Sequence, residues 1–95
     1  MTRTTRVGST TRPPALKVSL APEGMATVVV LQGEADVVSL PALSEALERI
    51  ISRHKGPVII DLADTAFIDS ATVRALSWAA VTLDKAGRPL SVRAP

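Results

Sequence analysis

The stretch Val58-Ile59-Ile60-Asp61-Leu62 decides the fold class of this chain. Four of its five residues are large and aliphatic, so a strand built from it is apolar on both faces, which is typical of a buried strand in a parallel sheet. The segment Leu40–His54 before it repeats apolar residues at three- and four-residue spacing, and this spacing predicts a helix. A strand that follows such a helix belongs to a right-handed strand-helix-strand crossover. We therefore predict an α/β domain with a mixed sheet.

Two further strands are predicted before this helix. Residues 16–20 (LKVSL) alternate apolar and polar side chains, as a half-buried strand does. Residues 26–31 (ATVVVL) are apolar on both faces, as a central strand is. The short turn between them, residues 21–24 (APEG), predicts that the two strands form a hairpin.

The first helix has recognisable ends. Ser39 is expected to be its N-cap, Pro41 suits its first turn, and Gly56-Pro57 ends it. The strand at residues 58–62 is then expected to lead into a loop at residues 63–69.

A second helix is predicted over residues 70–86, followed by a last strand at residues 89–93. Gly87 marks the end of this helix. The predicted order is therefore β-β-α-β-α-β. The buried arc of the second helix is expected to consist of Val73, Leu76, Ala80 and Leu83.

The size and charge of the chain limit what it does. Its 95 residues make one domain, and the absence of cysteine excludes disulfide scaffolds and thiolate metal sites. The net charge of +2 arises from Arg3, Arg6 and Arg12, because residues 15–95 hold eight basic and nine acidic residues. We expect a disordered basic arm at residues 1–14, a folded domain at residues 15–95, and no nucleic acid among the partners.

No apolar run in the sequence approaches the ~18–20 residues that span a bilayer. We therefore expect a cytoplasmic protein that does not insert into a membrane.

Four carboxylates near the predicted strand ends raise the question of catalysis, as in a phosphoaspartate or metal-hydrolase site. They are Asp36, Asp61, Asp64 and Asp69. The nearby sequence supplies neither a glycine-rich phosphate cradle nor a histidine base. We therefore predict no enzyme, no metal and no cofactor.

Ser70 lacks the histidine partner and the turn motif of a hydrolase nucleophile. We expect it to be the N-cap of the second helix. A hydroxyl at the exposed start of a helix is also a candidate switch, because an added phosphate would change the local charge.

Two motifs of this sequence resemble those of the STAS family, named for sulphate transporters and anti-sigma factor antagonists. The first motif combines residues 31–36 (LQGEAD) with residues 40–43 (LPAL). The second combines residues 58–62 (VIIDL) with residues 67–70 (FIDS), and continues with Ala75-Leu76 and residues 87–90 (GRPL). Both motifs stand in the family's order and separation.

The resemblance implies a STAS-like mixed sheet with helices packed mainly on one face, and no catalytic activity. It also implies partner switching. Bacterial antagonists of this family bind an anti-sigma factor that is also an ATP-dependent serine kinase, and phosphorylation by that kinase breaks the complex. A second interpretation is an accessory or scaffold subunit that docks to a membrane transport system or signalling complex without phosphorylation.

The sequence departs from the family pattern in two ways. Ala71 stands at the usual acceptor serine and Thr72 at the usual glycine, so either Ser70 or Thr72 is phosphorylated instead, or phosphorylation does not control this chain. We also expect the domain at residues 15–95 to lack the family's usual terminal helix or helices.

A partner surface is expected around the second motif and the loop before the first helix. Trp78 belongs to it on the helical wheel, where it lies nearly opposite the predicted buried arc, although its indole could instead fold over a neighbouring helix or the arm. The predicted partner-binding residues are Asp36, Ser39, Phe67, Asp69, Ser70, Ala71, Thr72, Arg74 and Trp78.

Overall fold

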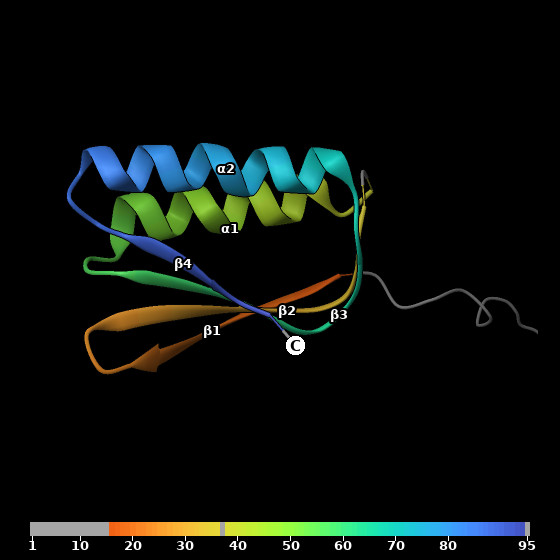
Figure 1. The fold of residues 1–95 in the computed structure, drawn as a ribbon, viewed down its shortest axis with the longest axis horizontal. Coiled ribbons are helices and arrows are strands. Elements are labelled where there is room, and N and C mark those ends of the chain that lie inside the picture. The colour runs from red at the N-terminus through yellow and green to blue at the C-terminus, as the bar shows by residue number, and fades with distance from the viewer. Residues whose placement is uncertain (1–15, 37, 95) are drawn as a thin grey trace, which may run out of the picture.

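The computed structural model describes residues 16–36 and 38–94. The predicted disordered arm, residues 1–14, lies outside the described residues. The described chain forms two layers, with a four-stranded sheet on one side and two helices packed on one face of it (Figure 1).

The sheet order is β1-β2-β3-β4, with β1 antiparallel to β2 and the other neighbours parallel. The predicted order β-β-α-β-α-β and the mixed sheet are confirmed. The elements are β1 (Lys17–Glu23), β2 (Ala26–Ala35), α1 (Leu40–Arg53), β3 (Val58–Ile68), α2 (Ser70–Lys85) and β4 (Leu90–Arg93).

Three strands extend beyond their predicted ends, and β3 does so most. The predicted loop at residues 63–69 was wrong, because β3 continues to Ile68 and pairs there with Ala35 of β2. The Thr65 hydroxyl also donates to the Leu31 carbonyl at 2.8 Å. Two register shifts between β2 and β3 accommodate this polar continuation. Pairing with β2, rather than local hydrophobicity, lengthens the strand.

The core lies between the sheet and the two helices. Its buried members from the sheet include Val29, Leu31, Val58 and Ile60, and those from the helices are Leu43, Leu47, Ile50, Leu76, Ala79 and Leu83.

The buried arc of α2 differs from the predicted one. Its buried residues are Thr72, Leu76, Ala79 and Leu83, whereas Val73 is 52% exposed. The helix packs beside α1 as well as over the sheet, so its buried strip is turned by about one residue position toward α1 (Figure 1).

Arg88 joins the C-terminal ends of the two helices. Its guanidinium donates from Nε to the Gly56 carbonyl at 2.9 Å and from Nη1 to the Ile51 carbonyl at 3.1 Å. Its own N–H donates to the Leu83 carbonyl at the end of α2. A cation at the end of α1 is favourable because the last carbonyls of a helix carry partial negative charge.

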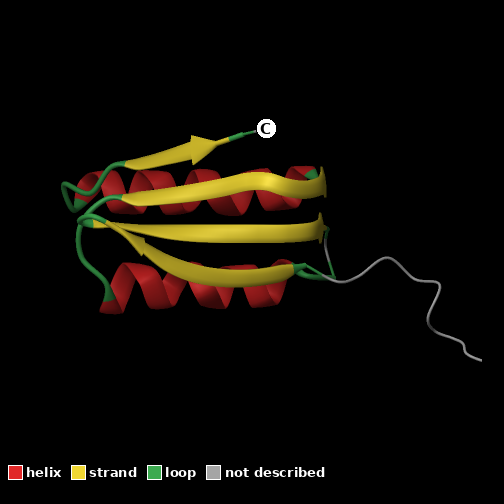
Figure 2. Cartoon of the chain, turned by 90° about the horizontal axis from the view of Figure 1, so that it is seen from below, coloured by secondary structure: helices red, strands yellow, loops and turns green. Residues whose placement is uncertain are grey.

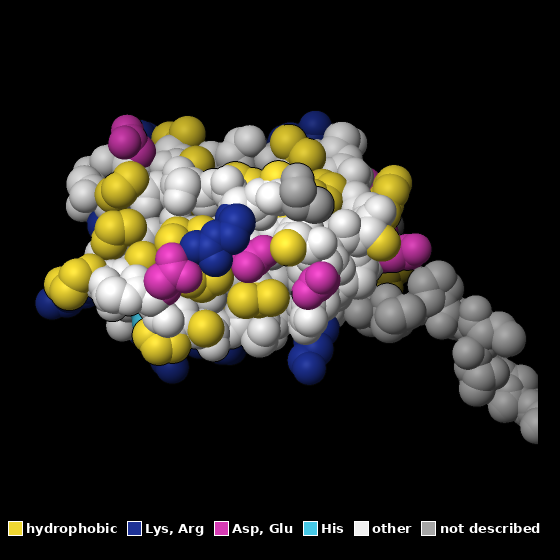
Figure 3. Space-filling model, turned by 60° about the horizontal axis from the view of Figure 1, so that its bottom comes forward, with side chains coloured by type: hydrophobic (Ala, Val, Ile, Leu, Met, Phe, Trp, Pro, Cys, Tyr) yellow, Lys and Arg dark blue, Asp and Glu magenta, His cyan; other side chains and the backbone are white. Residues whose placement is uncertain are grey.

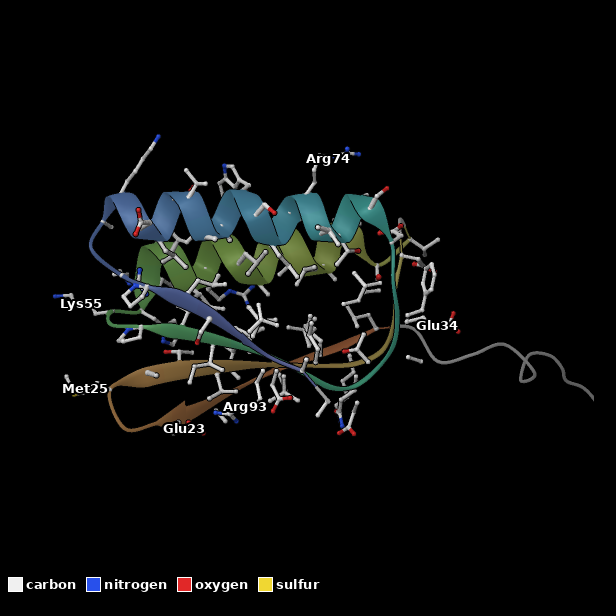
Figure 4. All side chains as sticks on the ribbon, in the orientation of Figure 1. Glu23, Met25, Glu34, Lys55, Arg74 and Arg93 are labelled. Atoms are coloured by element: carbon white, nitrogen blue, oxygen red, sulfur yellow. The ribbon has the colours of Figure 1, made fainter. Side chains whose placement is uncertain are left out.

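The other face of the sheet carries an ionic group. Arg93 of β4 lies 2.7 Å from the Glu23 carboxylate of β1 and 3.7 Å from that of Asp61 of β3. Figure 3 views the molecule from this side and shows basic and acidic side chains meeting near the middle of the face. The labelled Glu23 and Arg93 lie below the sheet, away from the helices, in Figure 4.

We predict that Gly56→Ala destabilises the domain more than Gly87→Ala. Both glycines have positive φ, 87° and 73°, where an L-residue costs about 1–2 kcal/mol. A Cβ at Gly56 would lie 2.5 Å from the Met25 carbonyl oxygen, whereas a Cβ at Gly87 meets open space. Urea unfolding of the two variants measures the difference, and equal losses of stability would contradict the clash.

Candidate functional site

The carboxyl ends of β2 and β3 form the candidate site. Ala35 and Ile68 are register partners at these ends, and the Asp69 N–H donates to the Ala35 carbonyl at 3.0 Å. The two sequence motifs therefore meet, as predicted. Figure 4 places Glu34 at this end of the molecule and Lys55 at the opposite end.

Asp36 and Ser39 hold the loop that leaves β2. The Oδ1 atom of Asp36 accepts the N–H groups of Val38 (3.0 Å) and Ser39 (3.2 Å). The Ser39 hydroxyl donates to the Asp36 carbonyl at 3.0 Å and accepts the Asp36 N–H at the same distance. These paired contacts join Asp36 to Ser39 just before α1.

Ser39 differs in two ways from its predicted roles. It occupies the N-cap position of α1, but its side chain caps no helical N–H, because its hydroxyl is engaged with Asp36. Only 9% of Ser39 is exposed. The side chain therefore shapes the loop from within and offers little contact area to a partner.

Asp69, rather than Ser70, is the N-cap of α2. Asp69 has extended backbone angles, and its Oδ1 accepts the Thr72 N–H at 2.8 Å, as an N-cap requires. The expectation that Ser70 caps the helix was wrong. Ser70 is instead the first helical residue, and it is exposed.

The environment of Asp69 favours its ionised form. The Thr72 backbone N–H is the main cause of a lowered pKa for Asp69, and the charge of Arg74 acts in the same direction. The start of α2 thus carries a stable negative charge, which the partial positive charge of the helix N-terminus favours.

Thr72 is fully buried, which contradicts its predicted place on an accessible surface. Its hydroxyl donates to the Ala35 carbonyl at 3.2 Å. A kinase cannot reach this oxygen while the domain is folded. Thr72 lies four residues before Leu76 and therefore on the same, inward face of α2. Its position on the helical wheel thus indicated that it is buried.

Exposed apolar side chains accompany the acids at this end. Phe67 is 52% exposed and Val38 is 74% exposed. Val73 is the third, on the first turn of α2. We call this group the carboxyl-end surface, defined by Glu34, Asp36, Val38, Phe67, Asp69, Ser70, Ala71 and Val73.

Three members of the carboxyl-end surface, Glu34, Val38 and Val73, were missed by the sequence reasoning. Val73 fitted the apolar arc of α2 and was assigned to the core. No sequence pattern predicted the exposure of Val38, because the exposure of a loop residue depends on the conformation of the loop.

Arg74 and Trp78 lie on the outer side of α2. Trp78 is 49% exposed, as its wheel position predicted. Arg74 points away from the sheet in Figure 4. Trp78 is two helical turns beyond Ser70, about 12 Å along the helix at 1.5 Å per residue, so it flanks the carboxyl-end surface and does not belong to it.

Three aspartates near the strand ends bond to backbone N–H groups. Asp36 and Asp69 each accept backbone N–H groups, and Asp61 accepts the Ala63 N–H at 2.9 Å on another part of β3. Within residues 16–36 and 38–94, no group of three or more His, Asp or Glu side chains is arranged to hold a metal ion.

None of the helices in the described part of the chain is long and apolar enough to cross a membrane.

The chain belongs to the STAS domain family. The family model described as "Mlab, STAS domain" matches residues 18–95. This match confirms the resemblance seen in the two motifs. No curated protein matches the chain.

Solved structures share the fold. An anti-sigma factor antagonist from Mycobacterium paratuberculosis is 24% identical with a TM-score of 0.74, and the match covers 84% of this chain and 68% of that one. The antisigma-factor antagonist STAS domain from Rhodobacter sphaeroides is 18% identical with a TM-score of 0.63, covering 83% and 84%. A structure described as Mglu is 23% identical with a TM-score of 0.69, covering 81% of this chain and 19% of that one.

We predict that Asp69→Ala destabilises the domain more than Asp69→Asn. Asparagine still accepts the Thr72 N–H at the N-cap, whereas alanine leaves it without this partner. The asparagine variant keeps the N-cap hydrogen bond and removes the charge, so it separates their two contributions to stability. Urea unfolding at about pH 7 and about pH 3 measures both contributions.

The pH dependence has a defined sign. Because folding lowers the pKa of Asp69, its charge stabilises the fold fully above the ordinary value of 3.8, and this contribution is lost as the pH falls through the lowered value. The advantage of the wild type over Asp69→Asn should therefore shrink in acid. An advantage that stays constant across this range would assign the whole effect to geometry.

Proposed function

We propose that this chain is a non-enzymatic protein-binding module of the anti-sigma factor antagonist type, which binds an anti-sigma factor through its carboxyl-end surface. The observation that carries the proposal is the exposure of Phe67, Val38 and Val73 beside Asp36 and Asp69 at the meeting point of the two family motifs. The shared fold with two antagonist structures supports it. The proposal includes a cytoplasmic location and a role in control of transcription.

The chemistry of the carboxyl-end surface favours a protein partner. Apolar area of this kind gains free energy when it is covered, and the ring of Phe67 is large enough to fill a pocket on the partner. The acids around it favour a partner whose facing side chains are basic or donate hydrogen bonds. The second oxygen of each carboxylate remains available, because the described bonds to Asp36 and Asp69 use Oδ1.

Ser70 is the proposed phosphorylation site if the partner is a serine kinase. Ala71 has no hydroxyl and the hydroxyl of Thr72 is buried, so Ser70 has the accessible oxygen among these three positions. A phosphate on the first residue of α2 would be tolerated by the helix, whose N-terminus favours negative charge. Its effect would fall on the complex, through repulsion and desolvation at a covered surface.

A second candidate function is constitutive docking to a membrane transport system or signalling complex. The observation in its favour is Ala71, which removes the hydroxyl at the family's usual acceptor position. The same carboxyl-end surface would then bind its partner with no switch. The two candidates differ in phosphorylation and share the contact surface.

We predict that Phe67→Ala lowers the affinity for a purified anti-sigma factor from the same genome about 10- to 30-fold, as loss of an aromatic anchor does. Leu20→Ala is the matched control, because Leu20 is 40% exposed on β1. Isothermal titration calorimetry measures both. Equal affinities for Phe67→Ala and the wild type would remove this surface from the proposal.

We predict that incubation with an anti-sigma factor kinase and ATP adds one phosphate, and that Ser70→Ala abolishes the addition while Ala71→Ser adds a second acceptor. Intact-mass spectrometry measures each outcome. An unmodified wild-type chain that still binds the kinase would favour the constitutive function. Phosphate that persists in Ser70→Ala would place the acceptor elsewhere.

A further inference from the structure

The two edges of the sheet differ in how they are protected. At the β1 edge, α1 lies behind the strand and reaches past it, whereas β4 extends past α2 at the other edge (Figure 2). The β1 edge also carries Lys17, Pro22 and Glu23, residue types that discourage pairing with another strand. In β4, positions 90–92 (LSV) carry neither charge nor proline.

Backbone directions make the contrast sharper. The Thr27 N–H donates to the Pro57 carbonyl, so the polar groups of Thr27 face β3 and those of its register partner Pro22 face outward from β1. Proline has no N–H to offer there, which breaks the row of donors at the β1 edge.

At the other edge, the Val58 N–H donates to the Pro89 carbonyl at 3.0 Å, so the polar groups of Pro89 face β3. The backbone N–H and C=O groups of successive residues point to opposite sides of a strand. Those of Leu90 and Val92 therefore face outward, away from β3. Among the described residues, β4 pairs with β3 alone. The β4 edge thus offers the N–H and C=O groups of both Leu90 and Val92 for pairing with another strand.

We propose that β4 pairs in antiparallel fashion with β4 of a second copy of this chain, about a twofold axis at Ser91. Leu90 of each copy then lies opposite Val92 of the other, and each of these two pairs exchanges two backbone hydrogen bonds. If the axis passed through Val92 instead, two of the three hydrogen-bonded residue pairs between the strands would need a residue beyond the end of β4. The bounds of the strand therefore select Ser91.

The side chains of β4 suit this pairing. Leu90 and Val92 line an apolar groove of about 300 Å³ beside α2, together with Leu62, Leu76 and Ala80, and Val92 is 54% exposed. Pairing sets Leu90 beside Val92 of the second copy on the helix side of the sheet. Cross-strand apolar contacts of this kind stabilise a sheet.

No like charges meet in the proposed pairing. Arg93, the charged residue of β4, lies opposite Pro89 of the second copy and is already paired with Glu23 and Asp61 of its own chain. The axis is perpendicular to the sheet, so it reverses the strand direction and keeps both helix layers on one face. The dimer has an eight-stranded sheet and carries its two carboxyl-end surfaces at opposite ends, so it is bivalent.

The first test is the mass of the full chain by sedimentation equilibrium at about 200 µM, a concentration that populates weak dimers. We expect a dimer for the wild type and a monomer for Val92→Glu, in which two carboxylates would enter the apolar contact. Leu20→Glu, a charge on the β1 edge, is the matched control and should remain dimeric. Circular dichroism checks that both variants stay folded. A monomeric wild type, or a dimer that Leu20→Glu breaks and Val92→Glu does not, overturns the proposal.

The second test checks the register. The chain has no cysteine, and Ser91 would face Ser91 of the second copy in a non-hydrogen-bonded pair, where Cα atoms lie about 4.5 Å apart and a disulfide fits. Ser91→Cys should form a disulfide-linked dimer in mild oxidant, and Ser19→Cys on β1 should not. Failure of Ser91→Cys to cross-link in a dimeric sample would show that the copies meet elsewhere.

Discussion

The carbonyl oxygen of Ala35 is the acceptor on which the structure at the carboxyl ends of β2 and β3 depends. Ala35 is fully buried at the end of β2, and its carbonyl accepts both the Asp69 N–H that follows β3 and the hydroxyl of Thr72 on α2. Three elements therefore meet at one atom. The Asp69 carboxylate completes the arrangement when it accepts the Thr72 N–H. The orientation of α2 relative to the loop after β2 follows from these contacts, and so does the shape of the carboxyl-end surface.

The polar groups at this end divide into those that build it and those that face outward. Ser39 and Thr72 are buried, and their hydroxyls bond to backbone carbonyls, so they belong to the scaffold. Phe67 and Ser70 are exposed, so their side chains face outward. The carboxylates of Asp36 and Asp69 each accept backbone N–H groups, so they too help to build this end.

The two edge strands of the sheet differ in how well they are protected against pairing with another strand. β1 has a charge at each end, an outward-facing proline and a helix that reaches past it, whereas β4 is uncharged at positions 90–92 and extends past its neighbouring helix. An edge with free donors and acceptors attracts another strand, and natural sheets usually block it. The unblocked edge lies away from the α1 side of the domain. Val73 of the carboxyl-end surface lines the same groove as Leu90 and Val92, so pairing through this edge takes place next to that surface.

The sequence by itself determined the elements and their order. The spacing of Leu43, Leu47 and Ile50 and the run at residues 58–62 express local periodicity, which a helix or strand imposes on its own residues. The paired motifs likewise identified the family and placed Asp36 and Asp69 at one end. Only the tertiary structure decided that β3 continues to Ile68, that Thr72 and not Val73 is buried, and that Asp69 caps α2. Each of these depends on a neighbour distant in the chain, because β2 supplies the pairing partner, α1 turns the buried strip of α2 and Ala35 supplies the acceptor.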